Sequence, residues 1–209
     1  MNAPLPASVL ASLPAPAAVQ QLHHYAYKAR DAEETRHFYE DILGLPLYHI
    51  IQSDYVPSTG EYCPYTHFFF RLKDGSFIAF FDIGDDEKAL PSPNTPLWIN
   101  HIAFRVNTVE ELENTKARLV AHGIEVLGVT DHHIFKSIYF FDPNGIRLEL
   151  SAQLADAAAM EKDSKVAHAR LAEWTARKEV WRKERAEGKT DSRLKPQSND
   201  RPEFVPGKG

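Results

Sequence analysis

Three residues that could bind a metal ion stand at equivalent places in two halves of the sequence. The segment "LHHYAYKARDAEET" aligns with "INHIAFRVNTVEEL", and this alignment pairs His24 with His101. The segment "KDGSFIAFF" aligns with "PNGIRLELS", and this second alignment pairs Ala79 with Glu149. The repeat therefore offers four equivalent strand positions, of which three carry a side chain able to bind a metal and the fourth carries a methyl group.

Two imidazoles and one carboxylate suit a divalent first-row metal. Three protein ligands leave three positions of an octahedron open, which is the arrangement of non-haem Fe(II) oxygenases. A carboxylate at Ala79 would complete a four-ligand site, better suited to Zn, Ni or Mn. Glu149 lies between Leu148 and Leu150, and burying an unpaired carboxylate is costly, so a cationic partner is expected there.

The composition indicates a soluble protein with one well-covered core or two small modules. The 209 residues are 43% hydrophobic and 11% aromatic, and the net charge of −5 does not favour a nucleic-acid partner. No apolar run reaches the length needed to span a bilayer. The single cysteine, Cys63, excludes an intramolecular disulfide and fits a reducing compartment, so a cytoplasmic location is predicted.

Each half begins with a strand and a helix. Asp31 and Thr108 are expected N-caps, each followed three residues later by a glutamate, as in a capping box. Gly44 and Gly123 are expected to end the two helices, because glycine readily adopts the left-handed conformation found beyond helix ends.

Each half then continues into a hairpin. The first hairpin, "THFFFRLKDGSFIAFFDI", is expected to turn at Asp74-Gly75. In the second, "IFKSIYFFDPNGIRLEL", Pro143 excludes a type I′ turn and favours a type I turn with Gly145 in the left-handed region. That register places Tyr139 directly across from Glu149, on the same face of the sheet.

Strand alternation also predicts which neighbours share that face. On the second hairpin the side chains expected inward are those of His133, Phe135 and Ser137. His132 is expected to point outward, although His132 or Asp131 becomes the inward group if the strand starts differently. If the first hairpin has the same turn as the second, the side chains of His67 and Phe69 face inward with that of Ala79.

The remaining segments of the chain, and the boundaries between its parts, are predicted from composition. "YHIIQSDYVPSTGEYCPYTH" is predicted to be an aromatic-rich loop, which either packs on the domain or forms a wall for a flat aromatic substrate. The stretch after residue 152 looks helical and sparsely apolar, which favours packing on the domain or on a second subunit. The expected divisions are a flexible Ala/Pro-rich leader (1–21), a central domain (22–152) with modules at about 22–90 and 97–152, a helical extension (153–188) and a mobile tail (189–209).

Three separated motifs, "LHHYAYKARDAEETRHFYEDILGLPL", "NHIAFRV" and "YFFDPNGIRLEL", resemble the vicinal oxygen chelate superfamily. This family includes glyoxalases, fosfomycin and bleomycin resistance proteins and type I extradiol dioxygenases. The resemblance implies an α+β fold of paired βαβββ modules, whose cup-shaped mixed sheet surrounds one metal, with the C-terminal helical extension lying outside it. It also implies that His24, His101 and Glu149 bind that metal.

The same resemblance places Tyr139 beside the substrate, with His133 as a supporting histidine. The acid/base histidine that the family carries just before the second ligand has no counterpart here, and His67 is the candidate to replace it.

The function that the resemblance implies, together with the three-ligand pattern, is Fe(II)-dependent extradiol-type cleavage of a catechol-like aromatic diol by O2, as in aromatic hydrocarbon catabolism. Mn(II) is the alternative metal, and a homodimer is expected. One alternative is a glyoxalase-like isomerase or lyase, which Ala79 disfavours because that chemistry usually has a fourth carboxylate. Another is a non-catalytic protein that sequesters a small molecule or drug.

Overall fold

The computed structural model describes residues 6, 8–9, 13–14, 18–89, 92 and 95–189, with Asp163 described by its backbone alone. Most of the predicted leader and the tail beyond residue 189 lie outside the described residues. The chain forms two compact units. Unit 1 comprises Met1–Pro93 with the short turn Pro143–Gly145, and unit 2 comprises Asn94–Asp142 with Ile146–Gly209.

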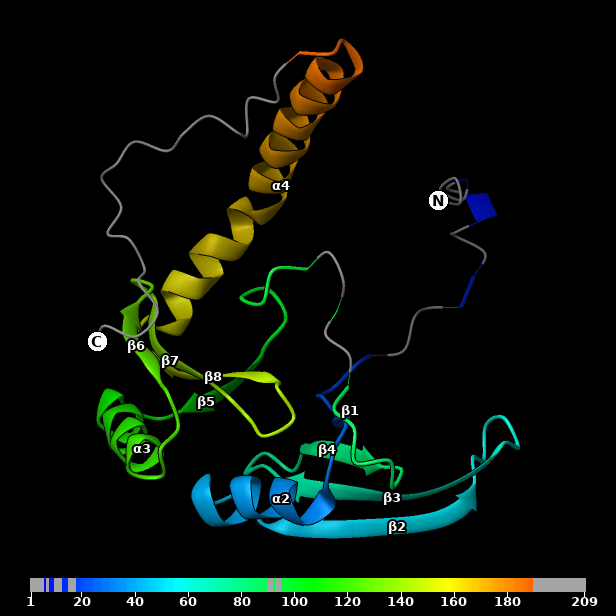
Figure 1. Ribbon diagram of the computed structural model, residues 1–209. Coiled ribbons are helices and arrows are strands. Elements are labelled where there is room, and N and C mark those ends of the chain that lie inside the picture. The colour runs from blue at the N-terminus through cyan, green and yellow to red at the C-terminus, as the bar shows by residue number, and fades with distance from the viewer. Residues whose placement is uncertain are drawn as a thin grey trace. The chain divides into compact units, whose positions relative to one another are not determined.

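Unit 1 is a four-stranded mixed sheet with a helical segment (Figure 1). The sheet order is β1-β4-β3-β2, in which β1 runs parallel to β4 and the other pairs are antiparallel. Its elements are β1 (His24–Lys28), α2 (Ala32–Arg36), the π-helix η1 (His37–Ile42), β2 (Leu47–Tyr55), β3 (Tyr62–Arg71) and β4 (Phe77–Asp82).

Unit 2 repeats this topology with the order β5-β8-β7-β6, and β5 runs parallel to β8. Its elements are β5 (Ile102–Val106), α3 (Val109–Ala121), β6 (Leu127–Asp131), β7 (Phe135–Phe141), β8 (Arg147–Gln153) and α4 (Ala157–Ala186). The two sheets confirm the predicted α+β fold built from two equivalent strand–helix–strand modules.

The strand register confirms the repeat residue by residue. The parallel pairs that correspond are Ala26 with Ala79 and Ala103 with Glu149. The antiparallel pairs that correspond are Phe69 with Ala79 and Tyr139 with Glu149, as the turn chemistry predicted. Gly145 has φ 85°, so it occupies the left-handed region expected of it.

Strand alternation separates the core of unit 2 from the face that carries its chemistry. Ile138, Phe140 and Leu148 are fully or almost fully buried, together with Leu112 and Leu119 of α3. The alternate positions on β7 and β8 belong to the opposite face. The polar side chains on that face include Ser137, Tyr139, Arg147, Glu149 and Ser151.

The helical segment of unit 1 is held by both a core and a polar network. Tyr39 of η1 is fully buried, and its ring lies 5.1 Å from that of Phe70 and 5.0 Å from that of Phe80. Asp31 caps α2 as predicted, because its side chain accepts a hydrogen bond from the backbone N–H of Glu34 at 2.6 Å.

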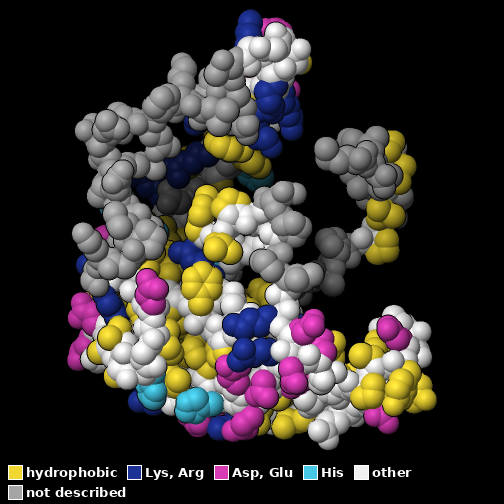
Figure 2. Space-filling model, in the orientation of Figure 1, with side chains coloured by type: hydrophobic (Ala, Val, Ile, Leu, Met, Phe, Trp, Pro, Cys, Tyr) yellow, Lys and Arg dark blue, Asp and Glu magenta, His cyan; other side chains and the backbone are white. Residues whose placement is uncertain are grey.

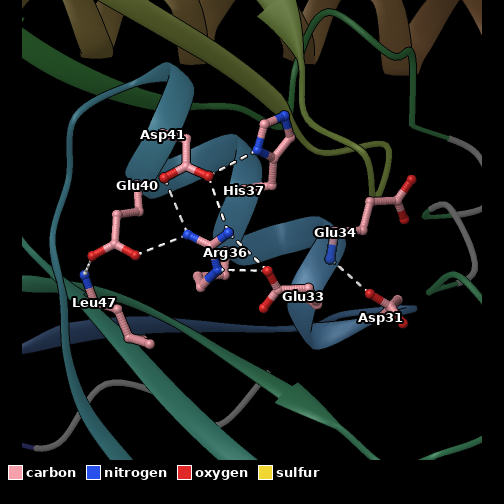
Figure 3. A network of polar contacts seen from close by, with 8 residues as sticks. All are labelled: Asp31, Glu33, Glu34, Arg36, His37, Glu40, Asp41 and Leu47. Carbon is pink, nitrogen blue, oxygen red and sulfur yellow. Dashed lines mark hydrogen bonds and ion pairs between the residues drawn. The ribbon is translucent and has the colours of Figure 1, made fainter.

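Arg36 joins α2, η1 and the start of β2 through a network of carboxylates (Figure 3). Its guanidinium binds Glu33 at 2.7 Å, Glu40 at 3.0 Å and Asp41 at 3.0 Å. The other carboxylate oxygen of Glu40 accepts the backbone N–H of Leu47 at 3.0 Å. These bonds connect the π-helical turn to the first residue of β2.

The aromatic-rich stretch predicted as a loop is instead mostly strand. It contains β2 and the beginning of β3, where Ile51 pairs with His67, and only residues 56–61 connect the two strands. Tyr55 and Tyr62 are 59% and 66% exposed. Figure 2 shows hydrophobic side chains gathered at the end of this hairpin. The turn-forming residues between the strands and the exposure of both faces concealed the alternation that would have predicted β2.

The predicted C-terminal helical extension is confirmed as α4. Asp156 caps it by accepting a hydrogen bond from the backbone N–H of Ala159 at 2.8 Å. Leu171 and Trp174, two of the sparse apolar residues of this helix, are 61% and 47% exposed. Among the described residues, no helix combines the length and the apolar character that crossing a membrane requires.

Candidate metal centre

The carboxylate of Glu149 lies at the middle of the polar face of unit 2 and is 4% exposed. Its Oε1 atom accepts hydrogen bonds from three hydroxyl groups: Ser137 at 2.5 Å, Ser151 at 2.8 Å and Tyr139 at 3.2 Å. These donors stabilise the ionised carboxylate in a buried position. They also fix its orientation, so that Oε2 is the oxygen presented to a further partner.

That further partner is His101, whose Nε2 atom lies 3.0 Å from Glu149 Oε2. The other ring nitrogen, Nδ1, lies 2.9 Å from the carbonyl oxygen of Ile99. A carbonyl only accepts, so Nδ1 carries a proton, and a neutral His101 therefore directs the Nε2 lone pair at the carboxylate. Two acceptors at this distance require a cation between them, which is either a second imidazole proton or a metal ion.

The geometry of the pair fits a metal. Nitrogen and oxygen ligands lie about 2.1 Å from a divalent metal, so two neighbouring ligands of an octahedron are about 3.0 Å apart and two ligands of a tetrahedron about 3.4 Å. The distance from His101 Nε2 to Glu149 Oε2 is 3.0 Å, which is compatible with two neighbouring metal ligands as well as with a hydrogen bond. The hydrogen bond from His101 Nδ1 to a backbone carbonyl is also the support that metal-binding histidines usually have.

His24, the remaining predicted ligand, stands at the start of β1 in unit 1. Its Nδ1 atom is 2.7 Å from Nδ1 of His23, and its ring lies 5.6 Å from Phe69 and 6.0 Å from His67. Within the described part of the chain, three or more His, Cys, Asp or Glu side chains are nowhere grouped to hold a metal ion. The structure thus brings together His101 and Glu149, and the participation of His24 stays a prediction.

His67 faces inward in unit 1, as predicted. It is 7% exposed, its ring stacks on Phe81 at 3.7 Å, and its Nδ1 donates to the carbonyl oxygen of Phe80 at 2.9 Å. Burial lowers the pKa of His67, against the smaller opposing effect of that hydrogen bond. The imidazole is therefore neutral near pH 7, with its lone pair on Nε2. Its acid/base role stays a prediction.

Ala79 is fully buried on the strand position that corresponds to Glu149. A methyl group therefore occupies the place at which a fourth ligand would stand.

The histidine beside Tyr139 is His132, so the predicted orientation of the two neighbouring histidines is wrong. His132 Nε2 lies 2.8 Å from the Tyr139 hydroxyl, whereas His133 is exposed and has φ 68°. Strand β6 ends at Asp131 and β7 begins at Phe135. Alternation does not continue through the bend between them, in which His133 adopts a left-handed conformation.

Sequence reasoning missed His132 as a site residue, although the alternative strand start had included it. The Tyr139 hydroxyl has one proton, which it donates to Glu149, so it accepts the proton of His132 Nε2. Burial raises the pKa of Tyr139, and the negative charge of Glu149 raises it further. A neutral tyrosine therefore links a histidine to the buried carboxylate.

Comparisons with known proteins identify the family of this chain. The family model of the Glyoxalase/Bleomycin resistance protein/Dioxygenase superfamily matches residues 21–150. Over 53 residues the chain is 40% identical to the putative ring-cleaving dioxygenase MhqA of Bacillus subtilis, which is 25% of this chain but only 17% of that protein. Over 159 residues it is 28% identical to the metallothiol transferase FosB of Staphylococcus saprophyticus, which is 75% of this chain and 92% of that protein.

A glyoxalase/bleomycin resistance protein/dioxygenase domain from Frankia sp. EAN1pec has a similar solved structure, with a TM-score of 0.54 and 17% sequence identity. The similarity covers 66% of this chain and all of that one. It supports the same fold.

Proposed function

Because this chain belongs to the Glyoxalase/Bleomycin resistance protein/Dioxygenase superfamily, we propose that it is a metal-dependent dioxygenase of the extradiol type. The proposed reaction adds both atoms of O2 to a catechol-like diol and breaks the ring bond beside the two hydroxyl groups. The observation that carries the proposal is the pairing of His101 and Glu149 at 3.0 Å next to Tyr139.

The proposed metal ligands are His101, Glu149 and, by its equivalent place in the repeat, His24. Fe(II) is the proposed metal and Mn(II) the alternative, since both accept two imidazoles and a carboxylate. When bound, the metal would lower the pKa of the diol and leave positions open for both substrates. Ala79 supports this three-ligand arrangement, because it supplies no fourth donor.

The protein's own proton carriers would be Tyr139 and His132. The Tyr139 hydroxyl lies within hydrogen-bond distance of both His132 and Glu149, so it can pass a proton between substrate and imidazole. His67, which is neutral and has a lone pair on Nε2, is the proposed additional base from unit 1. His133 keeps no role in this proposal because its side chain lies in the exposed bend.

A second candidate, a metal-dependent thiol transferase, is supported by the match to FosB, which covers 92% of that protein. The short match to MhqA covers a much smaller share of its relative. Both reactions fit a histidine paired with a buried glutamate beside a tyrosine, so the nature of the second substrate separates them.

Oxygen uptake distinguishes these functions. We expect the Fe(II)-loaded protein to consume O2 with a subset of a catechol panel and to form a yellow ring-opened product, with Glu149→Gln inactive. Consumption of a small thiol without O2 uptake would support the transferase and contradict the dioxygenase. Tight binding of the diols without turnover would instead indicate a binding protein.

The proposed assembly and location follow the sequence. A homodimer and a cytoplasmic location are proposed, the latter because Cys63 is the one cysteine in the sequence.

A further inference from the structure

Arg147 carries a positive charge on the same strand face as Glu149. It is the first residue of β8, two positions before Glu149, so alternation directs both side chains to one face. Two residues of a strand span about 6.6 Å, which is comparable to the width of a substituted benzene ring.

The guanidinium of Arg147 is held over the Tyr139 ring. Its Cζ atom lies 4.3 Å from the ring centroid, and Nη1 donates to the carbonyl oxygen of Trp98 at 2.5 Å. An arginine has five N–H donors, and in the described part of the chain Arg147 forms no ion pair with a carboxylate. Within the described residues, the hydrogen bond to Trp98 uses one of these donors and the others have no partner.

Packing on Tyr139 does not require a charge. In the repeat, Arg147 corresponds to Phe77 and Tyr139 corresponds to Phe69. Phe77 and Phe69 pack edge to face, with ring centroids 6.0 Å apart. Unit 1 thus fills the same pair of positions with two neutral rings, whereas unit 2 has a cation beside its buried carboxylate.

Apolar side chains accompany this cation. Leu97, Trp98 and Ile99, which lead to His101, are 70%, 67% and 44% exposed. A guanidinium with available donors beside exposed apolar side chains suits an aromatic acid, because a carboxylate accepts two parallel hydrogen bonds from arginine.

We propose that Arg147 binds a carboxylate on the substrate, so that the preferred substrates are aromatic diols bearing an acid group. This inference rests on the proposed function, since it assumes that a diol binds beside His101 and Glu149. Arg147 would then select the substrate and hold its ring against Tyr139.

Equilibrium binding tests this inference without turnover. The probes are 3,4-dihydroxybenzoate and 4-methylcatechol, titrated anaerobically into the Fe(II)-loaded protein by calorimetry. We expect wild type to prefer the acid, and Arg147→Gln to weaken its binding by about 10- to 100-fold while changing that of 4-methylcatechol less than about twofold. Arg147→Lys should retain part of the preference.

Arg71→Gln is the matched control, because Arg71 also lies over a tyrosine ring, at 4.7 Å from the Tyr48 centroid in unit 1. It should leave both affinities unchanged. If Arg147→Gln lost the same amount of affinity for both probes, Arg147 would only support Tyr139, and the inference would be overturned. Equal affinity of wild type for both probes, or no measurable binding of the acid, would also overturn it.

The two proposals can fail separately. If the preference for the acid depended on Arg147 but no diol caused O2 uptake, the proposed dioxygenase activity would be contradicted. The proposal that Arg147 binds a carboxylate would still hold. O2 uptake without that preference would contradict the role of Arg147 alone.

Discussion

Removing the hydroxyl of Ser137 tests how the protein holds the carboxylate of Glu149. Ser137 is fully buried and makes the shortest of the three hydrogen bonds to Oε1, at 2.5 Å. A hydrogen bond to a charged group contributes about 1.5–3 kcal/mol. Two other donors remain in Ser137→Ala, so we expect the free energy of unfolding to fall by the lower value, about 1.5 kcal/mol.

The same change should weaken metal binding. Groups that orient a metal ligand typically account for 10- to 100-fold in metal affinity, which is about 1.4–2.7 kcal/mol. We expect Ser137→Ala to lose affinity for Fe(II) within this range, because Glu149 would no longer be held in one orientation. Titration of the metal-free protein under anaerobic conditions measures the affinity, and urea unfolding measures the stability.

Ser76→Ala is the matched control. The Ser76 hydroxyl also donates to a carboxylate, Asp74 Oδ1, at 2.6 Å, and Ser76 is 3% exposed. This variant should leave metal affinity unchanged. If Ser137→Ala bound Fe(II) as tightly as wild type, or if Ser76→Ala weakened binding equally, the reasoning about Glu149 would be refuted.

Three further predictions concern other parts of the molecule. His132→Ala should lower kcat for ring cleavage by about 100-fold or more, whereas His133→Ala should change kcat less than twofold. Equal effects of the two variants in steady-state assays would contradict proton transfer through His132 and Tyr139. The carboxyl pKa of Asp41 is lowered to about 2, chiefly by its hydrogen bond from Arg36. The stability that this pair contributes should therefore be complete above about pH 4 and decline toward pH 2. The difference in urea midpoint between wild type and Arg36→Met should shrink over that range. A difference that stays constant with pH would show that it does not come from the Arg36–Asp41 pair. Ile138→Ala should lower the free energy of unfolding by about 2–5 kcal/mol and leave metal content unchanged, because Ile138 packs in the core on the far side of β7.

The sequence predicts the fold well where neighbouring residues restrict the backbone to one conformation. Pro143 and Gly145 restrict the turn so strongly that the pairing of Tyr139 with Glu149 follows from them. The internal repeat then transfers this register to Phe69 and Ala79. Helix starts are similarly local, since Asp31 and Thr108 each accept the backbone N–H expected of an N-cap.

The errors arise where periodicity is interrupted. His133 takes a left-handed conformation, which ends the alternation and brings His132 to Tyr139. Strand β2 was missed because it lies at the sheet edge, where apolar residues such as Ile50 and Ile51 are exposed on successive positions. The π-helix η1 depends on longer-range packing of Tyr39 and on the carboxylates around Arg36, which a helical pattern does not reveal.

Metal content measures the central claim most directly. Wild type, purified anaerobically and loaded with Fe(II), should retain close to one metal ion per chain after gel filtration. His24→Ala, His101→Ala and Glu149→Ala should each lose it, whereas the matched variant His133→Ala should keep it. Full metal content in any of the first three variants, with the fold intact by circular dichroism, would contradict the three-ligand centre.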